Sequence, residues 1–189
     1  MIPRKLIYKY QRELVKEHLR SLQGHDRYLR FGAMLTDELI NSYVDRCWGT
    51  HMDAWFGIIE NNKIIAVIHV AKEKENKAEL GLSVNSDWRG KKLGQALFER
   101  AVIYLKAIDV KHVFMHCLSE NAIMRHIALK NSMEMRTFYG ETDADITIEN
   151  NKFIDPAVEV LTEQLAIYDN NVRKVRSAWK NYLESIALA

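Results

Sequence analysis

A short loop at residues 87–90 and the helix start after it are together rich in glycine and basic residues, and they lie between two apolar segments. Residues 79–84 before it read as a strand, and residues 91–108 after it read as a helix. The first turn of a helix offers unpaired N–H groups and a partial positive charge, which suit a pyrophosphate. Glycines let the backbone approach phosphates closely, and basic side chains add charged donors. The pattern predicts phosphate binding, with a strand-to-helix turn that carries a solvated basic face as the alternative.

Two stretches of this region resemble motifs of a known family. Residues 89–94, Arg-Gly-Lys-Lys-Leu-Gly, resemble the signature Arg/Gln-x-x-Gly-x-Gly/Ala of the GNAT N-acetyltransferases. Residues 121–133, which open on Asn121, resemble the second motif of that family. The resemblance implies acetyl-CoA as co-substrate, with its pyrophosphate at residues 89–95 and its pantetheine along residues 82–84. The implied cofactor-binding residues are Leu82, Ser83, Val84, Arg89, Gly90, Lys91, Lys92, Leu93, Gly94, Gln95 and Asn121.

Three positions depart from the family pattern. Lys92 stands where the signature has its first glycine, and we expect the loop to hold it at negative φ. Ser132 replaces a glycine near the end of the second motif, and Ala128 occupies the position of a tyrosine that many relatives use as general acid. The leaving thiolate has a pKa near ~8.5 and departs without a dedicated acid. Because the tyrosine is missing, we expect the main catalytic residue to be a general base and not a general acid.

The candidate bases are Glu79 and His116. A lysine-like amine has a pKa of ~10.4, so a group that removes its proton is the useful catalytic part. Glu79 begins the strand that should border the cofactor, and its alternative is a solvated strand end paired with Lys77. His116 precedes Asn121 by five positions, and its alternative is a half-buried strand residue. His69 is a weaker third candidate.

Other kinds of chemistry find less support in the sequence. The seven histidines show no ligand spacing that favours a metal, so no metal is expected. Direct transfer in a ternary complex is preferred over an acyl intermediate on Cys117. The acceptor is expected to be a primary amine, on a small molecule or on a protein. The alternative function is a non-catalytic GNAT-fold protein that binds acyl-CoA or a partner.

The elements that must position these residues form an α/β order. The expected fold is GNAT-like (α+β), with a mixed, centrally splayed sheet flanked by helices. Helices are expected at residues 11–22, 36–48, 91–108 and 121–131, and strands at 4–10, 55–59, 63–71, 78–84, 112–118, 135–139 and 145–148. Gly24 is expected to end the first helix. Residues 26–32, dense in arginine and aromatics, either line the acceptor site or dock the helices on the sheet.

A long amphipathic helix is expected at residues 156–186, with Asp155 as its N-cap and Pro156 in its first turn. Its apolar residues recur at alternating spacings of three and four, a heptad pattern that we call the seam. The seam consists of Val158, Leu161, Leu165, Tyr168, Val172, Val175, Trp179, Tyr182 and Ile186. We expect a GNAT-like domain at residues 1–150 and an appended helix at 151–189 that self-associates into a homodimer or other homo-oligomer. The alternatives are a helix folded back on its own domain, or a partner protein on the seam.

The composition argues against several other classes of protein: nucleic-acid-binding, membrane-spanning and secreted proteins. The chain has 189 residues, 48% of them hydrophobic, and a formal net charge of +2. That balance argues against wholesale nucleic-acid binding. No apolar stretch approaches the ~20 residues that span a bilayer, and residues 1–10 do not resemble a secretion signal. Two widely spaced cysteines favour a reducing compartment, so a cytoplasmic protein without a membrane or nucleic-acid partner is expected.

Overall fold

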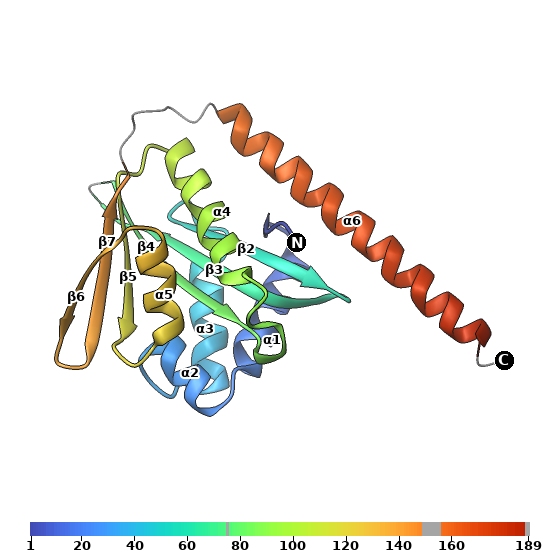
Figure 1. Cartoon of the computed structure of the whole chain (residues 1–189), viewed down its shortest axis with the longest axis horizontal. Helices are drawn as coiled ribbons and strands as arrows, with labels where there is room; N and C mark the ends of the chain where they lie inside the picture. The colour runs from blue at the N-terminus through green and yellow to red at the C-terminus, as the bar shows by residue number, and fades with distance from the viewer. Residues whose placement is uncertain (75, 149–155, 188–189) are drawn as a thin grey trace.

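A seven-stranded sheet forms the centre of the molecule (Figure 1). The computed structural model describes residues 1–74, 76–148 and 156–187. The strands lie in the order β1-β2-β3-β4-β5-β7-β6, and every neighbouring pair is antiparallel except β4 and β5. They are β1 (Arg4–Lys5), β2 (Asp53–Glu60), β3 (Lys63–Lys72), β4 (Lys77–Val84), β5 (His112–Leu118), β6 (Glu134–Phe138) and β7 (Glu141–Thr147).

The parallel pair β4–β5 comes apart part-way along its length. Its ladder covers Lys77–Glu79 of β4 against residues 112–114 of β5, and beyond Glu79 the two strands have no paired residues. On its other side, β4 stays paired with β3 as far as Val84. The sheet therefore opens between residues 80–84 and residues 115–118, as the expected central splay requires.

Helices cover both faces of the sheet. They are α1 (Lys9–Ser21), α2 (Gly24–Phe31), α3 (Asp37–Cys47), α4 (Leu93–Ala107), α5 (Ala122–Lys130) and α6 (Pro156–Ala187). One apolar core lies between the sheet and α4 and α5, and it includes Phe56, Leu80 and Leu97. A second core lies under α1 and α3, and it includes Leu19 and Ile40. Successive residues of β4 point to opposite faces of the sheet, because side chains alternate along a strand, and Ala78, Leu80 and Leu82 face the first core.

Local signals in the sequence explain several element boundaries. Thr36 accepts a hydrogen bond from the Leu39 N–H at 3.3 Å and begins α3 as its N-cap. Asn61 and Asn62 both have positive φ, which fits the tight turn between β2 and β3. Asn121 caps α5 through a bond from the Met124 N–H at 3.1 Å.

The N-terminal region differs from its expected form. The strand expected at residues 4–10 is only Arg4–Lys5, because α1 already begins at Lys9. Gly24 does not simply end the first helix, since it opens α2 with φ +46°. The 26–32 segment is therefore mostly helical, and Gly32 ends it in the left-handed conformation.

The helix α6 extends over 32 residues, about 48 Å, and its C-terminal end projects past the sheet (Figure 1). The expected helix at 156–186 is confirmed, and its expected N-cap Asp155 lies outside the described residues. The α6 residues Glu163 and Asp169 accept hydrogen bonds from the backbone N–H groups of Lys5 and Ile2. The helix thus covers the open edge of β1. No helix within the described ranges combines the length and apolar character of a membrane span.

Candidate functional site

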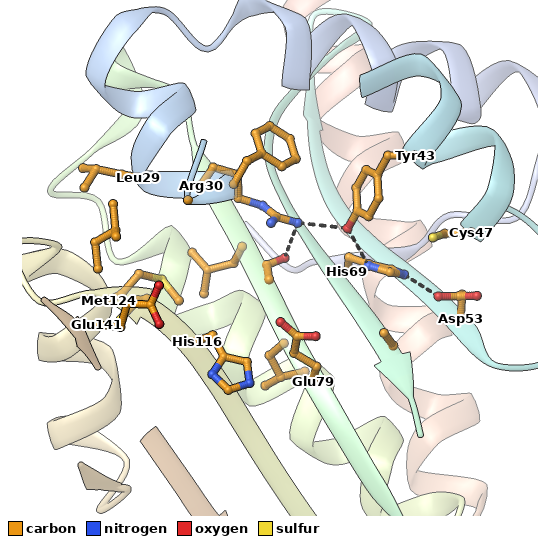
Figure 2. Close-up of a pocket in the computed structure, with 18 residues that line it drawn as sticks. Leu29, Arg30, Tyr43, Cys47, Asp53, His69, Glu79, His116, Met124 and Glu141 are labelled. Carbon is orange, nitrogen blue, oxygen red and sulfur yellow. Dashed lines mark hydrogen bonds and ion pairs between the residues drawn. The ribbon is translucent and has the colours of Figure 1, made fainter. Parts of the chain in front are cut away.

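Two cavities meet at the opening between β4 and β5. The first, of about 450 Å³, contains side chains of β3, β4, β5 and α3 (Figure 2). The second, of about 480 Å³, lies between β4, α4 and α5. Four residues line both cavities: Leu29, Arg30, Leu82 and Met124. A ligand in one cavity can therefore reach a ligand in the other across the unpaired stretch of β4.

The second cavity contains nearly all of the residues expected to bind the cofactor. They are Leu82, Ser83, Val84, Arg89, Gly90, Lys92, Leu93, Gly94, Gln95 and Asn121. Lys91 does not line it, and its ammonium lies over the Trp88 ring at 4.0 Å. The Ser83 hydroxyl points to the opposite face of the sheet, where it bonds His18 Nε2 at 2.8 Å. Ser83 can therefore offer this cavity only its backbone.

The loop before α4 turns through two residues with positive φ, Gly90 at +74° and Lys92 at +60°. The expectation of negative φ at Lys92 is wrong, because Lys92 is the N-cap of α4 in the left-handed conformation. This conformation costs a residue with a Cβ roughly 1–2 kcal/mol. It still leaves the first N–H groups of α4 at the cavity wall, where an anion can accept from them.

Gly94 and Asn121 each have a structural role. A Cβ at Gly94 would meet Ile127 Cδ1 at 2.9 Å, so a side chain here would require the end of the Ile127 side chain to move at the contact between α4 and α5. Asn121 is buried, and besides capping α5 it donates from Nδ2 to the Leu29 carbonyl at 3.4 Å. It thereby ties α5 to α2 between the two cavities.

Both candidate bases line the first cavity, on neighbouring strands (Figure 2). Among the described residues, nothing hydrogen bonds the Glu79 carboxylate, which is half-buried. His116 Nδ1 contacts Asp143 Oδ1, and the imidazole is 58% exposed. A carboxylate that holds one nitrogen of a histidine leaves the other nitrogen for proton transfer. The geometry thus places the unengaged Glu79 carboxylate near an oriented imidazole in a cavity that Glu141 also lines.

A family model for the acetyltransferase (GNAT) family matches residues 16–131, which is more than half of the chain. The chain belongs to the GNAT acetyltransferase family. It is therefore an acyltransferase by family, and its fold agrees with that membership. No curated protein matches it significantly by sequence.

Solved GNAT structures share this fold at low sequence identity. The GNAT domain of PAT from S. lividans has a TM-score of 0.67 at 14% identity, over 77% of this chain and 89% of that one. PaiA N-acetyltransferase from Thermoplasma acidophilum, in complex with coenzyme A, has a TM-score of 0.58 at 16% identity, over 78% and 100%. Ribosomal-protein-alanine N-acetyltransferase from Brucella melitensis gives 0.64 at 9%, over 78% and 100%. The TM-scores show that these proteins share the fold of this chain. Identities this low do not identify the acetyl acceptor of this chain.

Two departures from the GNAT pattern have a structural explanation. Ala128 is buried in the core under α5 and lines neither cavity, so this position supplies no acid to the site. Ser132 follows α5 with φ +57°, the conformation for which a glycine is suited. Ser132 therefore adopts the left-handed conformation without a glycine.

A partly buried chain of hydrogen-bonded polar side chains, which the sequence did not reveal, lies on one side of the first cavity (Figure 2). Arg30 Nη2 donates to the Tyr43 hydroxyl at 3.2 Å, and Tyr43 lies 2.7 Å from His69 Nδ1. His69 Nε2 lies 2.7 Å from Asp53 Oδ1. Burial, and then Arg30, lower the His69 pKa to about 4, so the ring is neutral at pH 7. With Asp53 ionised, Nε2–H donates to it and Nδ1 accepts from Tyr43.

His69 is consequently a poor direct base, because both of its ring nitrogens are engaged. Of the four residues linked by these hydrogen bonds, only His69 was a candidate base from the sequence. Tyr43 and Asp53 lie on α3 and β2, and no local spacing connects them to β3. Arg30 also donates to the Gly81 carbonyl at 3.4 Å, so the chain fixes α2 above the open stretch of β4.

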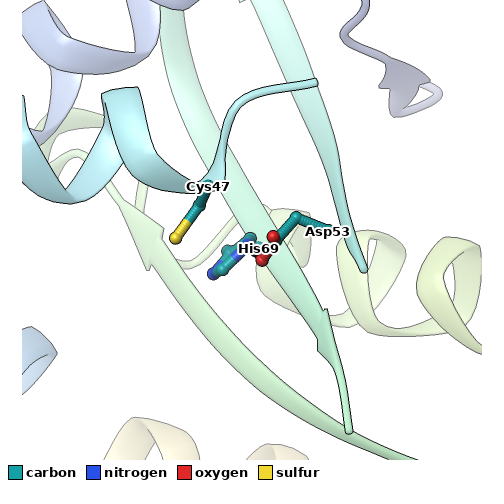
Figure 3. Close-up of side chains that lie close together, drawn as sticks. All are labelled: Cys47, Asp53 and His69. Carbon is teal, nitrogen blue, oxygen red and sulfur yellow. Dashed lines mark hydrogen bonds and ion pairs between the residues drawn. The ribbon is translucent and has the colours of Figure 1, made fainter. Parts of the chain in front are cut away.

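Cys47, Asp53 and His69 form the one group of three potential metal-ligand side chains found among the described residues (Figure 3). Their donor atoms lie within 4.8 Å of one another. Both ring nitrogens of His69 and one oxygen of Asp53 already take part in hydrogen bonds, and burial raises the pKa of the Cys47 thiol. A cation would have to displace at least one of these hydrogen bonds and the thiol proton. The expectation of no metal stays a prediction.

Cys117 lines the first cavity on β5. Burial raises the pKa of its thiol, which reduces the thiolate available to attack a thioester. The expected preference for direct transfer over a Cys117 intermediate stays a prediction.

His18 makes the stability of this fold sensitive to acid. It bonds the Ile64 carbonyl and the Ser83 hydroxyl, and burial lowers its pKa to about 4. Between pH 6.5 and 4 the unfolded chain binds a proton that the folded chain does not. The free energy of unfolding should therefore fall as pH drops through that range, by up to about 1.4 kcal/mol per pH unit from this residue. Urea unfolding at several pH values measures the slope.

The matched variant for this prediction is His18→Gln, which retains a donor and an acceptor but does not titrate. Its pH slope should be smaller than that of the native chain. An NMR titration in which the His18 ring protonates near pH 6.5 would contradict the prediction.

Proposed function

We propose that this chain transfers an acetyl group from acetyl-CoA to a primary amine by direct attack within a ternary complex. The observation that carries the proposal is the pair of cavities that join at the unpaired stretch of β4. The second cavity receives the donor and the first receives the acceptor. The reacting carbonyl then lies near Leu82, which lines both.

The second cavity suits a phosphorylated donor. It combines the N-terminus of α4 with the cationic side chains of Arg89, Lys92 and Lys130. Backbone N–H groups and cations together stabilise a pyrophosphate more than either does alone. The pantetheine arm lies along residues 82–84, whose edge toward β5 lacks a partner strand. The coenzyme A complex of PaiA supports a coenzyme A ligand for this fold.

The first cavity suits an amine acceptor. Glu79 is the proposed base and His116 the second candidate, because both border the point where the amine would approach. The base takes the proton from the ammonium, and the neutral amine nitrogen attacks the thioester carbonyl. The C–S bond then breaks to release the coenzyme A thiolate, and the nitrogen loses its second proton to that thiolate or to water, which leaves the amide. The acceptor belongs to a small molecule or a protein. Both cysteines are free, which fits a reducing compartment such as the cytoplasm.

The direct test is release of free thiol from acetyl-CoA across a panel of amines, beside calorimetric titration of acetyl-CoA alone. Turnover with at least one amine class supports the proposal. Binding without release against every amine would favour a non-catalytic acyl-CoA-binding protein, the alternative that Ala128 suggests. Absence of binding would reject the donor site itself.

Arg89 provides a sharper test of the donor site. Its guanidinium lies 2.7 Å from the Asp26 carboxylate at the rim of the second cavity. Arg89→Ala should weaken acetyl-CoA binding by roughly 1–3 kcal/mol if a charged hydrogen bond to phosphate is lost. Asp26→Asn should instead strengthen binding, because it removes an anion that competes for Arg89 and repels the phosphates.

Calorimetric titration of both variants with acetyl-CoA measures whether each substitution weakens or strengthens binding. If Arg89 served only to fasten α2, Asp26→Asn would weaken binding as Arg89→Ala does. That outcome would remove Arg89 from the proposed site.

A further inference from the structure

The helix α6 rests on its own domain through a polar face. We call this the docking face; it consists of Glu159, Glu163, Ala166, Asn170, Arg173 and Ser177. Ala166 and Asn170 are fully buried against the domain. Arg173 pairs with the Glu60 carboxylate and donates to the Ile59 carbonyl, each within 2.8 Å. The alternative of a helix folded back on its domain is therefore realised, but not through the seam.

The seam points away from the domain. It lies about 150° around the helix axis from the docking face, at 100° per residue. Its described side chains are exposed, from 41% at Val158 to 72% at Val175, and Trp179 is 63% exposed. A contiguous apolar stripe of this length on a helix that is already anchored marks an interaction surface.

The charges beside the seam favour an antiparallel copy of the same helix. If Val172 faces Val175 of a second copy, the heptad geometry places Tyr168 opposite Trp179. The same register places Asp169 opposite Arg176 at the flanking positions, and twofold symmetry makes this pair twice. Asp169 remains 27% exposed in its side chain, and Arg176 is exposed, so both are accessible from outside. Because the docking face is opposite, the second domain would lie on the far side of the helix pair.

We propose that two copies of this chain associate through their α6 seams as an antiparallel helix pair. The surface is independent of the acetyl-transfer site, since no residue of the seam lines either cavity. A three-four seam with complementary flanking charges is the pattern of a helix pair, whereas a helix lying on lipid carries a broader apolar face.

Sedimentation equilibrium tests the association with two matched variants on exposed valines. Val175→Glu places a charge on the seam, and Val160→Glu places the same charge off it, at a residue that is 59% exposed. The native chain and Val160→Glu should be dimers. Val175→Glu should raise the dissociation constant by about 100-fold or more, because symmetry introduces the buried charge twice. Native circular dichroism in both variants confirms the fold.

Disulfide cross-linking tests the orientation. Tyr168→Cys and Trp179→Cys chains should cross-link when mixed, and each alone should not, with the native chain as the background for Cys47 and Cys117. Cross-linking of Tyr168→Cys with itself would indicate a parallel pair and overturn the register. A native monomer at every concentration, or equal dimerisation of both valine variants, would overturn the proposal. A monomer that binds anionic phospholipid vesicles through Val175 would assign the seam to a membrane surface instead.

Discussion

The Glu79→Gln chain is expected to lose kcat by ~10²–10⁴ while its affinity for acetyl-CoA changes little. The amine acceptor arrives protonated at neutral pH, and a glutamine cannot take its proton. The Glu79 carboxylate, like that of Glu141 in the same cavity, has no hydrogen-bond partner among the described residues, so its lone pairs are available for this step. Steady-state rates with saturating amine, from pH 6 to about pH 10 where a lysine-like amine is half neutral, measure the loss. It should shrink as pH rises.

Two comparisons make this result interpretable. Glu141 lines the same cavity, so Glu141→Gln controls for the loss of a negative charge near the acceptor. His116→Gln and Asp143→Asn test the second candidate, because Asp143 orients the His116 ring. If Glu79→Gln keeps full activity and the His116 and Asp143 variants both lose it, the base is His116. Equal small losses in the Glu79 and Glu141 variants would mean that neither carboxylate is the base.

The Glu159→Gln/Glu163→Gln double variant is expected to lose roughly 3–5 kcal/mol of stability. Arg100 is 2% exposed, and its guanidinium is paired with both carboxylates at 2.7–2.9 Å while lying over the Phe56 ring. Removing the two anions leaves a buried cation without compensation. Glutamine retains the side-chain length and an acceptor oxygen, so the loss reports the charge. Urea unfolding gives the free-energy difference.

Adding Arg100→Met to the double variant separates charge from packing. This third change removes the stranded cation, so part of the stability should return. Glu184→Gln, in the exposed Lys180–Glu184 pair on the same helix, should change stability by less than ~1 kcal/mol. A double variant as stable as the native chain would show that α6 is not held by Arg100.

Most of the fold could be predicted because its strands and long helices have clear periodicity. The strand expected at residues 112–118 matches β5, and that at 63–71 falls one residue short of β3. The helix α2 was missed because it is short and begins at Gly24, a residue type that usually ends helices. The apolar residues of this segment fitted a loop that docks on the sheet as well as they fitted a helix.

The candidate site was predictable where its residues are adjacent in the chain. Residues 89–95 except Lys91 line one cavity, because a strand, a loop and a helix start form a local unit. Asn121 joins them from the start of α5, where the second motif placed it. The chain Arg30–Tyr43–His69–Asp53 joins four separate elements, so only the folded sheet brings it together. Similarly, the seam of α6 was evident from its heptad spacing, whereas the polar docking face depends on partners such as Arg100 in another helix.

The contacts between α6 and the first residues of the chain can form only late during synthesis, because α6 is made last. The bonds from Ile2 and Lys5 join residues 167 and 158 positions apart. At ~5–20 residues per second, a ribosome needs about 10–30 s to make the intervening chain. Throughout that interval the outer edge of β1 has no α6 to cover it, and an uncovered strand edge is a template for pairing with other chains. Because β1 is only two residues long, the strand edge that is exposed before α6 is synthesised is very short, which limits pairing with other chains.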